Sequence, residues 1–101
     1  MTDILARGKF PVPVDRALVA ADWRRRGYSC DLFVDPPGQE WNDFVHGTDE
    51  LVTVAEGRLR LVVGDVTVVA APGDEVFIPR GVHHSVHNVH AGTTRWLYGY
   101  G

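Results

Sequence analysis

Residues 73–88 of this chain read GDEVFIPRGVHHSVHN, which combines two turns, a short apolar segment and a pair of histidines. The segment Glu75–Ile78 is largely apolar and favours a β-strand. The turn that follows, Pro79-Arg80-Gly81, joins a residue of fixed φ to a residue that tolerates positive φ, which is typical of a tight turn. The stretch therefore predicts two neighbouring strands, the second of which begins with histidines.

The second of these strands divides its histidines between two faces. Side chains alternate along a strand, so His84 and Asn88 share one face, whereas His83 and His87 share the other. We expect His84 to point into the protein and His83 and His87 to lie in solvent. His90 follows in a turn and is also expected to be exposed.

Strand patterns of this kind continue through most of the chain. Alternation begins at Tyr28, and turn signals such as Pro36-Pro37-Gly38 and Gly64-Asp65 interrupt it repeatedly. We expect strands over residues 28–35, 39–46, 51–56, 58–63, 66–71, 75–78, 84–89 and 93–100. Many short strands separated by turns predict an antiparallel sandwich or barrel, so the expected fold class is all-β.

A helical pattern occurs only near the N-terminus. Asp15 is a good N-cap, and Gly27 stands where a left-handed residue often ends a helix, so a short helix is predicted through about Arg26. An irregular arm packed over the sheet is the alternative. The apolar stripe of the expected helix is marked by Leu18, Ala21 and Asp22 or Arg25.

The chain is expected to be one domain with an N-terminal extension. Residues 10–14 alternate with prolines and predict an edge strand or an extended arm. Residues 1–27 are thus expected to form an arm and short helix packed on a β-barrel domain over residues 28–101. The arginine cluster at residues 24–26 is interpreted as a solvated helix end rather than an anion site.

The composition excludes several classes of protein. The chain has 101 residues, of which 45% are hydrophobic and 23% charged, and its net charge of −3 gives no field that favours nucleic acid. Cys30 is the one cysteine, which excludes an internal disulfide and a cysteine-rich zinc site. No apolar run has the length of a secretion signal or a membrane span, so a cytoplasmic protein is expected.

Two blocks of the chain carry a recognisable spacing of residues. The downstream block contains Gly73, Pro79, Gly81, His84 and Asn88. The upstream block contains Gly38, His46, Glu50 and Gly57. These blocks resemble the two conserved motifs of the cupin superfamily, whose fold is a small β-barrel of the jelly-roll type. The second motif is matched at every defining position, but in the first motif Phe44 stands where a histidine is expected.

The resemblance implies a single cupin-type jelly-roll barrel that holds a divalent metal ion. Carried over position by position, it implies His46, Glu50 and His84 as ligands of zinc, iron, manganese or nickel. Two histidines and one carboxylate form a recognised set for such ions. Phe44 cannot be a ligand and is expected to line a more apolar pocket, together with Asn42 on the face of His46. Two alternatives stay open. His46 and His84 could be buried, hydrogen-bonded histidines, and Glu50 could be a turn residue paired with an arginine.

The other prominent residues have structural interpretations. Turn-forming or turn-tying roles are expected for Gly38, Gly57, Gly73, Pro79, Gly81 and Asn88. The aromatic side chains are expected in the core or at a subunit interface, with a platform for a ligand as the alternative. These aromatics are Trp41, Trp96, Tyr98 and Tyr100.

The leading functional hypothesis is a small metal-binding cupin with a partly apolar pocket for a small molecule. The second hypothesis is a binding or sensing module that holds a small ligand without metal. A third is a metal-dependent dioxygenase or isomerase that acts on a small organic acid or sugar. A homodimer is expected by resemblance and because the edges of a small barrel need cover, with no nucleic-acid or membrane partner.

Overall fold

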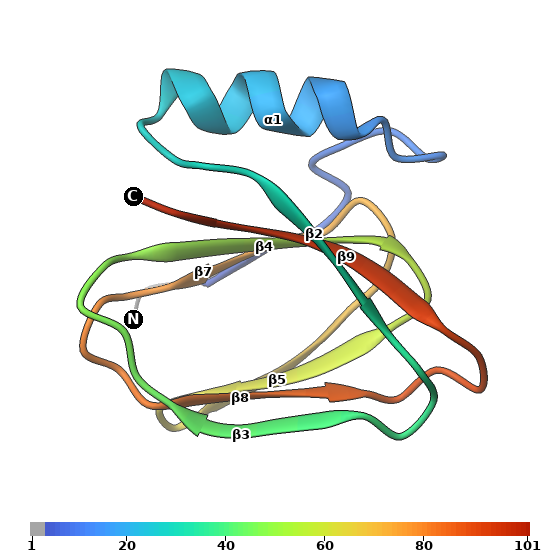
Figure 1. Cartoon of the computed structure of the whole chain (residues 1–101), viewed down its shortest axis with the longest axis vertical. Coiled ribbons are helices and arrows are strands. Elements are labelled where there is room, and N and C mark those ends of the chain that lie inside the picture. Colours follow the sequence, from blue (N-terminus) through green and yellow to red (C-terminus); the bar gives the residue numbers. More distant parts are fainter. Residues whose placement is uncertain (1–3) are drawn as a thin grey trace.

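Two antiparallel sheets face each other and enclose the core, and one helix covers the outside of one sheet (Figure 1). The structure, a computed structural model, describes residues 4–101, so the first three residues of the predicted arm lie outside the described residues. The strands are β1 (Leu5–Ala6), β2 (Asp31–Asp35), β3 (Glu40–Phe44), β4 (Glu50–Glu56), β5 (Leu59–Val63), β6 (Val66–Ala70), β7 (Glu75–Ile78), β8 (His84–Asn88) and β9 (Thr94–Tyr100). The helix is α1 (Arg16–Arg25). The predicted all-β fold is confirmed.

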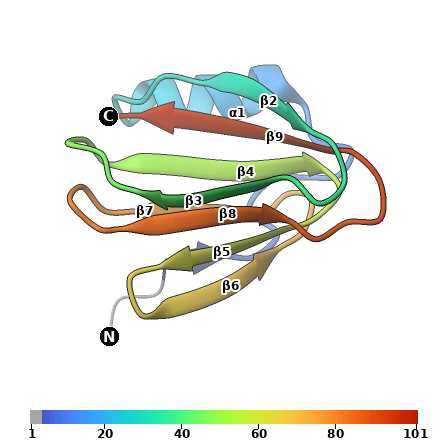
Figure 2. The same ribbon diagram turned by 60° about the horizontal axis from the view of Figure 1, so that its bottom comes forward.

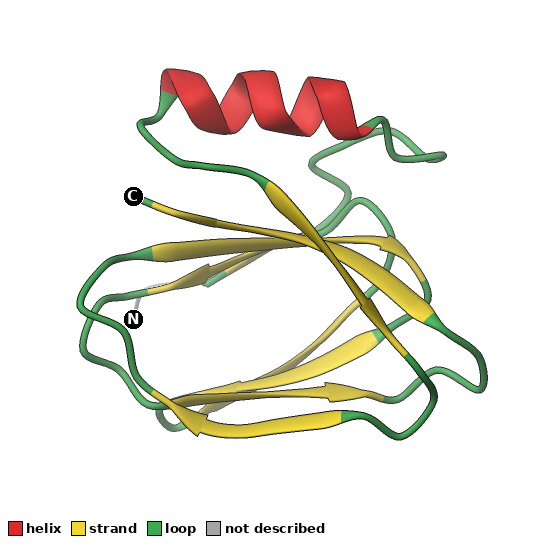
Figure 3. Ribbon diagram, viewed as in Figure 1, coloured by secondary structure: helices red, strands yellow, loops and turns green. Residues whose placement is uncertain are grey.

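The sheets are built from strands far apart in the sequence. One sheet has the order β1-β7-β4-β9-β2, and the other has the order β3-β8-β5-β6 (Figure 2). Figure 3 shows the strands in two layers, with the helix outside them. The eight strands expected from the alternating pattern all form. β1 was not expected, since the arm pairs with the sheet at Leu5 and Ala6 rather than within residues 10–14. The arm therefore contributes an edge strand to the five-stranded sheet.

The predicted helix forms with the predicted ends, but it buries a different stripe. The side chain of Asp15 accepts a hydrogen bond from the backbone N–H of Ala17, and Gly27 has a φ of 88°. The prediction of Leu18 in the stripe is wrong, because Leu18 is 55% exposed whereas Val19 and Trp23 are fully buried. These two side chains pack on the outer face of the five-stranded sheet, which leaves β4 buried on both faces.

A buried carboxylate fastens the helix to the sheet. Glu75 accepts hydrogen bonds from the indole N–H of Trp23 at 2.8 Å and from both terminal nitrogens of Arg26 at 2.8 and 3.1 Å. Lys9 adds a longer ion pair at 3.4 Å. Burial opposes ionisation, but the bonds from Arg26 and Trp23 hold the pKa of Glu75 below its usual value. Residues 24–26 are exposed at the end of the helix, in agreement with their interpretation as a solvated helix end, and Arg26 in addition pairs with Glu75.

Side chains from both sheets fill the interior of the barrel. Val52 and Val54 of β4, Leu59 and Leu61 of β5 and Val76 of β7 are fully buried in one cluster. Along each strand these inward-facing residues alternate with residues that point to the outer face, as expected when one face of a sheet lines the core.

The turn residues expected from the two blocks do occupy turns. The glycines at positions 38, 57, 73 and 81 all have positive φ. At Gly57 a side chain would also collide with Thr94, so both the backbone and the space require glycine there. Asn88 is buried and connects the loops that follow β2 and β8, because its side-chain amide donates to the carbonyl oxygens of Asp35, Pro36 and Gly92. No helix in residues 4–101 is long and apolar enough to cross a membrane.

Candidate metal centre and its pocket

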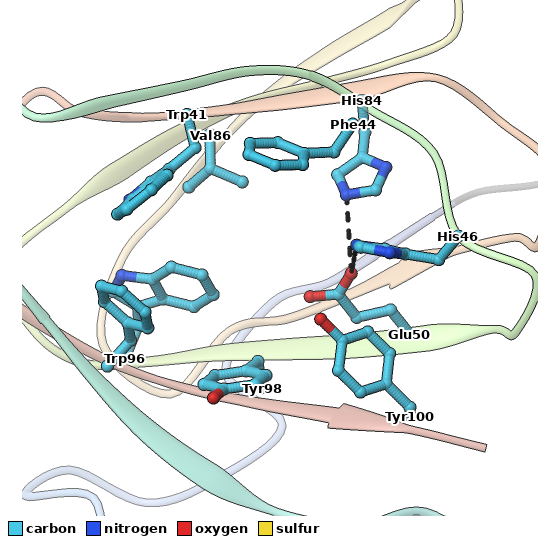
Figure 4. A pocket seen from close by; sticks show the side chains of 10 residues that line it. Trp41, Phe44, His46, Glu50, His84, Val86, Trp96, Tyr98 and Tyr100 are labelled. Atoms are coloured by element: carbon cyan, nitrogen blue, oxygen red, sulfur yellow. Dashed lines mark ion pairs between the residues drawn. The ribbon is translucent and has the colours of Figure 1, made fainter.

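Three potential metal ligands converge at one end of the barrel (Figure 4). His46 follows β3, Glu50 begins β4 and His84 begins β8. One donor atom from each lies within 4.8 Å of the others. Oε1 of Glu50 is 3.6 Å from Nε2 of His46 and 3.5 Å from Nε2 of His84. The structure therefore brings together the three residues that the sequence singled out.

The two turns that carry these residues are fastened to each other. The backbone N–H of Gly81 donates to the carbonyl oxygen of His46 at 2.9 Å. The backbone N–H of Arg80 donates to the carboxylate of Asp49 at 2.8 Å. The turn at Pro79–Gly81 thus holds the loop that presents His46, which explains why a tight turn precedes His84.

Glu50 is a buried carboxylate without a full set of partners. Its side chain is 5% exposed, and Oε1 is buried with no hydrogen-bond donor among the described residues. Burial raises the pKa of Glu50 to about 7. A buried carboxylate oxygen in this state is costly unless a cation or a proton compensates it.

His84 is oriented so that its second nitrogen faces Glu50. Nδ1 lies 3.3 Å from the carbonyl oxygen of Val82, which can only accept, so the ring proton belongs on Nδ1. Nε2 then presents its lone pair toward Oε1 of Glu50. Burial lowers the pKa of His84, which favours this neutral form. A backbone carbonyl behind the ring is the usual support of a metal-binding histidine.

The donor set fits a divalent transition metal. Ligand atoms held at about 2.0–2.2 Å from a common ion lie roughly 3–3.5 Å apart, close to the separations around Glu50. Two lone pairs aimed at each other repel, and a cation between them removes that repulsion. Two imidazoles and one carboxylate suit zinc, iron, manganese or nickel and leave further positions open.

A cavity of about 210 Å³ extends from these ligands between the two sheets. Its polar end is formed by His46, Glu50, His84 and Tyr100. The rest of its wall is mostly apolar and is formed by Phe33, Trp41, Phe44, Val86, Trp96 and Tyr98, of which Tyr98 also carries a hydroxyl group. Figure 4 shows these side chains pointing into a common space. The four aromatics whose place was open between core, interface and ligand platform all line this cavity.

An irregularity in β3 decides which of its residues face the cavity. The register with β8 shifts between Trp41 and Phe44, and Asp43 has a φ of 57°. This bulge reverses the alternation, so Trp41 joins Phe44 on the cavity side. The expectation for Asn42 is wrong: it is exposed and outside the cavity, and its amide oxygen lies 2.6 Å from Nε2 of His87. Phe44 itself lies on the wall of the cavity.

Asp35 is a buried residue that the sequence pattern did not single out. It is 1% exposed and accepts hydrogen bonds from the indole N–H groups of both Trp41 and Trp96, at 3.2 and 3.0 Å. Alternation alone shows only which strand residues share a face, and an aspartate before a proline turn is ordinarily a surface residue. The sequence therefore held no pattern that identified Asp35, because its role depends on where Trp41 and Trp96 lie in the folded chain.

The remaining histidines lie outside the cavity. His83 is exposed and pairs with the carboxylate of Asp43 at 2.8 Å. His87 is half-buried on the outer face, where Arg60 and Asn42 contact its two ring nitrogens. His90 is exposed. The prediction that His84 is the inward-facing histidine of β8 is confirmed.

Comparison with known proteins supports one family. Residues 31–100 match the family model described as a cupin domain. An uncharacterised protein of Streptomyces coelicolor is 33% identical over 66 residues, which span 65% of this chain and 63% of that protein. The matched region is thus less than two thirds of the length of that relative.

Solved structures agree with this match. A protein from Thermus thermophilus has a TM-score of 0.66 and 31% identity, covering 72% of this chain and 71% of that one. A cupin 2 domain-containing protein from Halorhodospira halophila has a TM-score of 0.68 and 23% identity, covering 72% and 51%. An oxalate oxidase in complex with glycolate has a TM-score of 0.68 and 21% identity, covering 74% and 42%. The last two matches show the fold alone. With its family model matched over most of its length, this chain belongs to the cupin family.

Proposed function

We propose that this chain is a small metal-binding cupin that holds a divalent ion through His46, Glu50 and His84. The observation that carries the proposal is the buried Oε1 of Glu50, which has no hydrogen-bond donor among the described residues and lies about equally far from two imidazole nitrogens. A divalent cation compensates the carboxylate and satisfies both lone pairs. The pocket beside it accepts a small organic molecule.

When bound, the ion would supply a Lewis-acidic centre with positions open to an oxygen atom of a ligand. This chain's own residues hold that centre at the end of an apolar cavity, and Tyr98 and Tyr100 add hydroxyl groups to its wall. Burial and the nearby Glu50 raise the pKa of Tyr100, so its hydroxyl keeps its proton at neutral pH. A dioxygenase or isomerase activity stays a hypothesis, because the fold alone does not select a reaction.

The second candidate is a module that binds its ligand without metal. Phe44 favours it, since this ring occupies the position of a fourth ligand in the resembling motif and lies 6.3 Å from the rings of His46 and His84. In this case Glu50 would be protonated in the resting protein. The carboxyl proton would then fill the place of the cation.

Metal analysis of protein purified without a histidine tag separates the two candidates. We expect about one equivalent of zinc, iron, manganese or nickel per chain, either as purified or after incubation with the salts. Occupancy below about a tenth of an equivalent after each incubation contradicts the metal-binding proposal. Tag-free protein is needed because a histidine tag itself binds these ions.

We also propose that the chain pairs with a second copy. β6 ends the four-stranded sheet, and Val66 and Val69 on it are 39% and 41% exposed. An edge strand with apolar side chains is commonly covered in the native assembly. Light scattering coupled to size-exclusion chromatography should give the mass of a dimer, and the mass of one chain at all concentrations would contradict this.

A further inference from the structure

The cavity has two chemically different ends, and its far end offers a ligand little but aromatic surface. Phe33 packs edge to face with Trp41 and stacks with Trp96, at centroid distances of 5.3 and 5.6 Å. Tyr98 lies 6.1 Å from Phe33 and 5.7 Å from Trp96. These rings come from strands of both sheets, so they line the cavity from both sides. Figure 4 shows Trp41 on one side of this space and Trp96 and Tyr98 on the other.

The polar atoms of the two tryptophans are not available to a ligand. An indole has a single N–H donor and no acceptor. In Trp41 and Trp96 that donor already points to the buried carboxylate of Asp35, which does not line the cavity. Asp35 therefore turns both polar edges away and fixes the two rings, leaving faces and C–H edges toward the cavity.

No cationic side chain neutralises this end. Of the residues described, those that line the cavity include no lysine and no arginine. A negatively charged group of a ligand placed among Phe33, Trp41 and Trp96 would lose its hydration without gaining a partner, which is strongly unfavourable. A sugar would likewise leave several hydroxyl groups unpaired there.

The size of the cavity suits about one ring of a ligand. A cavity of about 150 Å³ lined by apolar side chains holds benzene, so about 210 Å³ holds a six-membered ring with a few further atoms. Aromatic walls at these distances favour a planar ring by stacking or edge-to-face contacts.

We propose that the pocket binds a planar, single-ring organic molecule with one oxygen donor at the metal end and no negatively charged group at the other. This inference rests on the proposed function, because the oxygen donor is assigned to an ion held by His46, Glu50 and His84. It excludes small dicarboxylates and sugars as good ligands. The oxalate of the oxidase that shares the fold is one such dicarboxylate.

Calorimetric titration of the metal-loaded protein tests the far end with a matched pair of probes. The two probes, 4-methylbenzoate and terephthalate, share one ring and one carboxylate and differ only in the methyl or carboxylate group opposite. We expect the dissociation constant of 4-methylbenzoate to be at least about tenfold lower than those of terephthalate, oxalate and glucose. Equal or tighter binding of any of these three, or no binding of 4-methylbenzoate at millimolar concentration, overturns the proposal.

A variant pair locates the binding on the proposed wall. The change Phe33→Leu keeps an apolar side chain but removes the ring, so the dissociation constant of 4-methylbenzoate should rise roughly threefold to tenfold with metal content unchanged. Leu32→Ala is the control, since Leu32 lies on the outer face of the same strand and is 39% exposed. An equal effect of Phe33→Leu and Leu32→Ala contradicts this location. The comparison of the probes uses the unchanged chain, so it remains valid even if a variant does not fold.

A second pair keeps this test separate from the metal proposal. If the protein holds no metal, 4-methylphenol and 4-hydroxybenzoate are titrated instead, since a phenol can bond to Glu50 without an ion. A preference of about tenfold or more for 4-methylphenol supports the ligand class although the metal proposal has failed. If the protein holds metal but binds terephthalate more tightly than 4-methylbenzoate, the metal proposal stands and the proposed ligand class is contradicted.

Discussion

Glu50 and His84 face each other across the barrel, with Oε1 of the first 3.5 Å from Nε2 of the second. Glu50 begins β4 of the five-stranded sheet, and His84 begins β8 of the four-stranded sheet. The pair therefore forms only when the two sheets pack. Because an ion bound here is held by both sheets, its binding is expected to stabilise the folded chain against unfolding.

Removal of His84 should abolish metal binding. Loss of a partner behind a metal ligand lowers affinity roughly 10- to 100-fold, and loss of a ligand itself should lower it at least as much. We therefore expect His84→Ala to retain little metal after dialysis, as measured by elemental analysis. His87→Ala is the matched control from the outer face of the same strand and should keep the metal content of the unchanged chain. Equal losses in both variants would show that the assignment of faces is wrong.

Glu50 should make the stability of the metal-free protein depend on pH. Its folded-state pKa of about 7 lies above the usual 4.5, so the unfolded chain releases this proton first as pH rises. Stability from this group is thus present below pH 4.5 and lost as pH rises through 7, by roughly 3 kcal/mol at most. Bound metal reverses the trend, because the ion requires the carboxylate.

Urea unfolding in the presence of a chelator measures this effect. His84 acts in the opposite direction, since its lowered pKa removes stability as pH falls, so the variant Glu50→Gln is needed to isolate Glu50. The difference in unfolding free energy between the unchanged chain and Glu50→Gln should shift against the unchanged chain between about pH 5 and pH 8. A constant difference across this range would contradict the raised pKa.

Replacement of Phe44 by histidine should strengthen metal binding. Phe44 pairs with His84 across β3 and β8, and its ring points into the cavity beside both imidazoles (Figure 4). A further imidazole here would add a ligand, and we expect Phe44→His to tighten metal binding roughly tenfold or more in a competition assay with a chelating dye. Phe44→Leu is the control, which keeps the site apolar and should not tighten binding. Equal affinities of Phe44→His and the unchanged chain would place residue 44 too far from the ion.

The contact of Glu75 with the helix should matter for stability but not for metal. The change Glu75→Gln leaves Arg26 and Lys9 without their buried counter-charge and should lower the free energy of unfolding by about 2 kcal/mol. Glu56→Gln, which alters an exposed pair with Arg95, should change it by less than about 0.5 kcal/mol. Chemical denaturation of both variants checks this, and loss of metal in Glu75→Gln would show that the helix supports the site.

Local chemistry accounts for what could be predicted from the sequence. An aspartate cap and a left-handed glycine mark the ends of α1 because both act within one turn of the backbone. Turn glycines and prolines marked the ends of most strands for the same reason. His46, Glu50 and His84, which the barrel brings together, were indicated by the resemblance to the cupin motifs rather than by local chemistry.

Three-dimensional packing accounts for what could not be predicted. Alternation shows which residues of a strand share a face, but the bulge at Asp43 reverses it and exchanges Asn42 for Trp41 at the cavity wall. The buried stripe of α1 and the pairing of Arg26 with Glu75 likewise depend on which sheet face the helix covers.

The fold class followed from the order of residues, and the three converging candidate ligands followed from the resemblance of that order to the cupin motifs. The shape and chemistry of the cavity were not, because Asp35 meets Trp41 and Trp96 only after β2, β3 and β9 have packed. Contacts of this kind join side chains that are not spaced at any regular interval in the sequence. Their geometry follows from strand register and sheet packing, which no local pattern encodes.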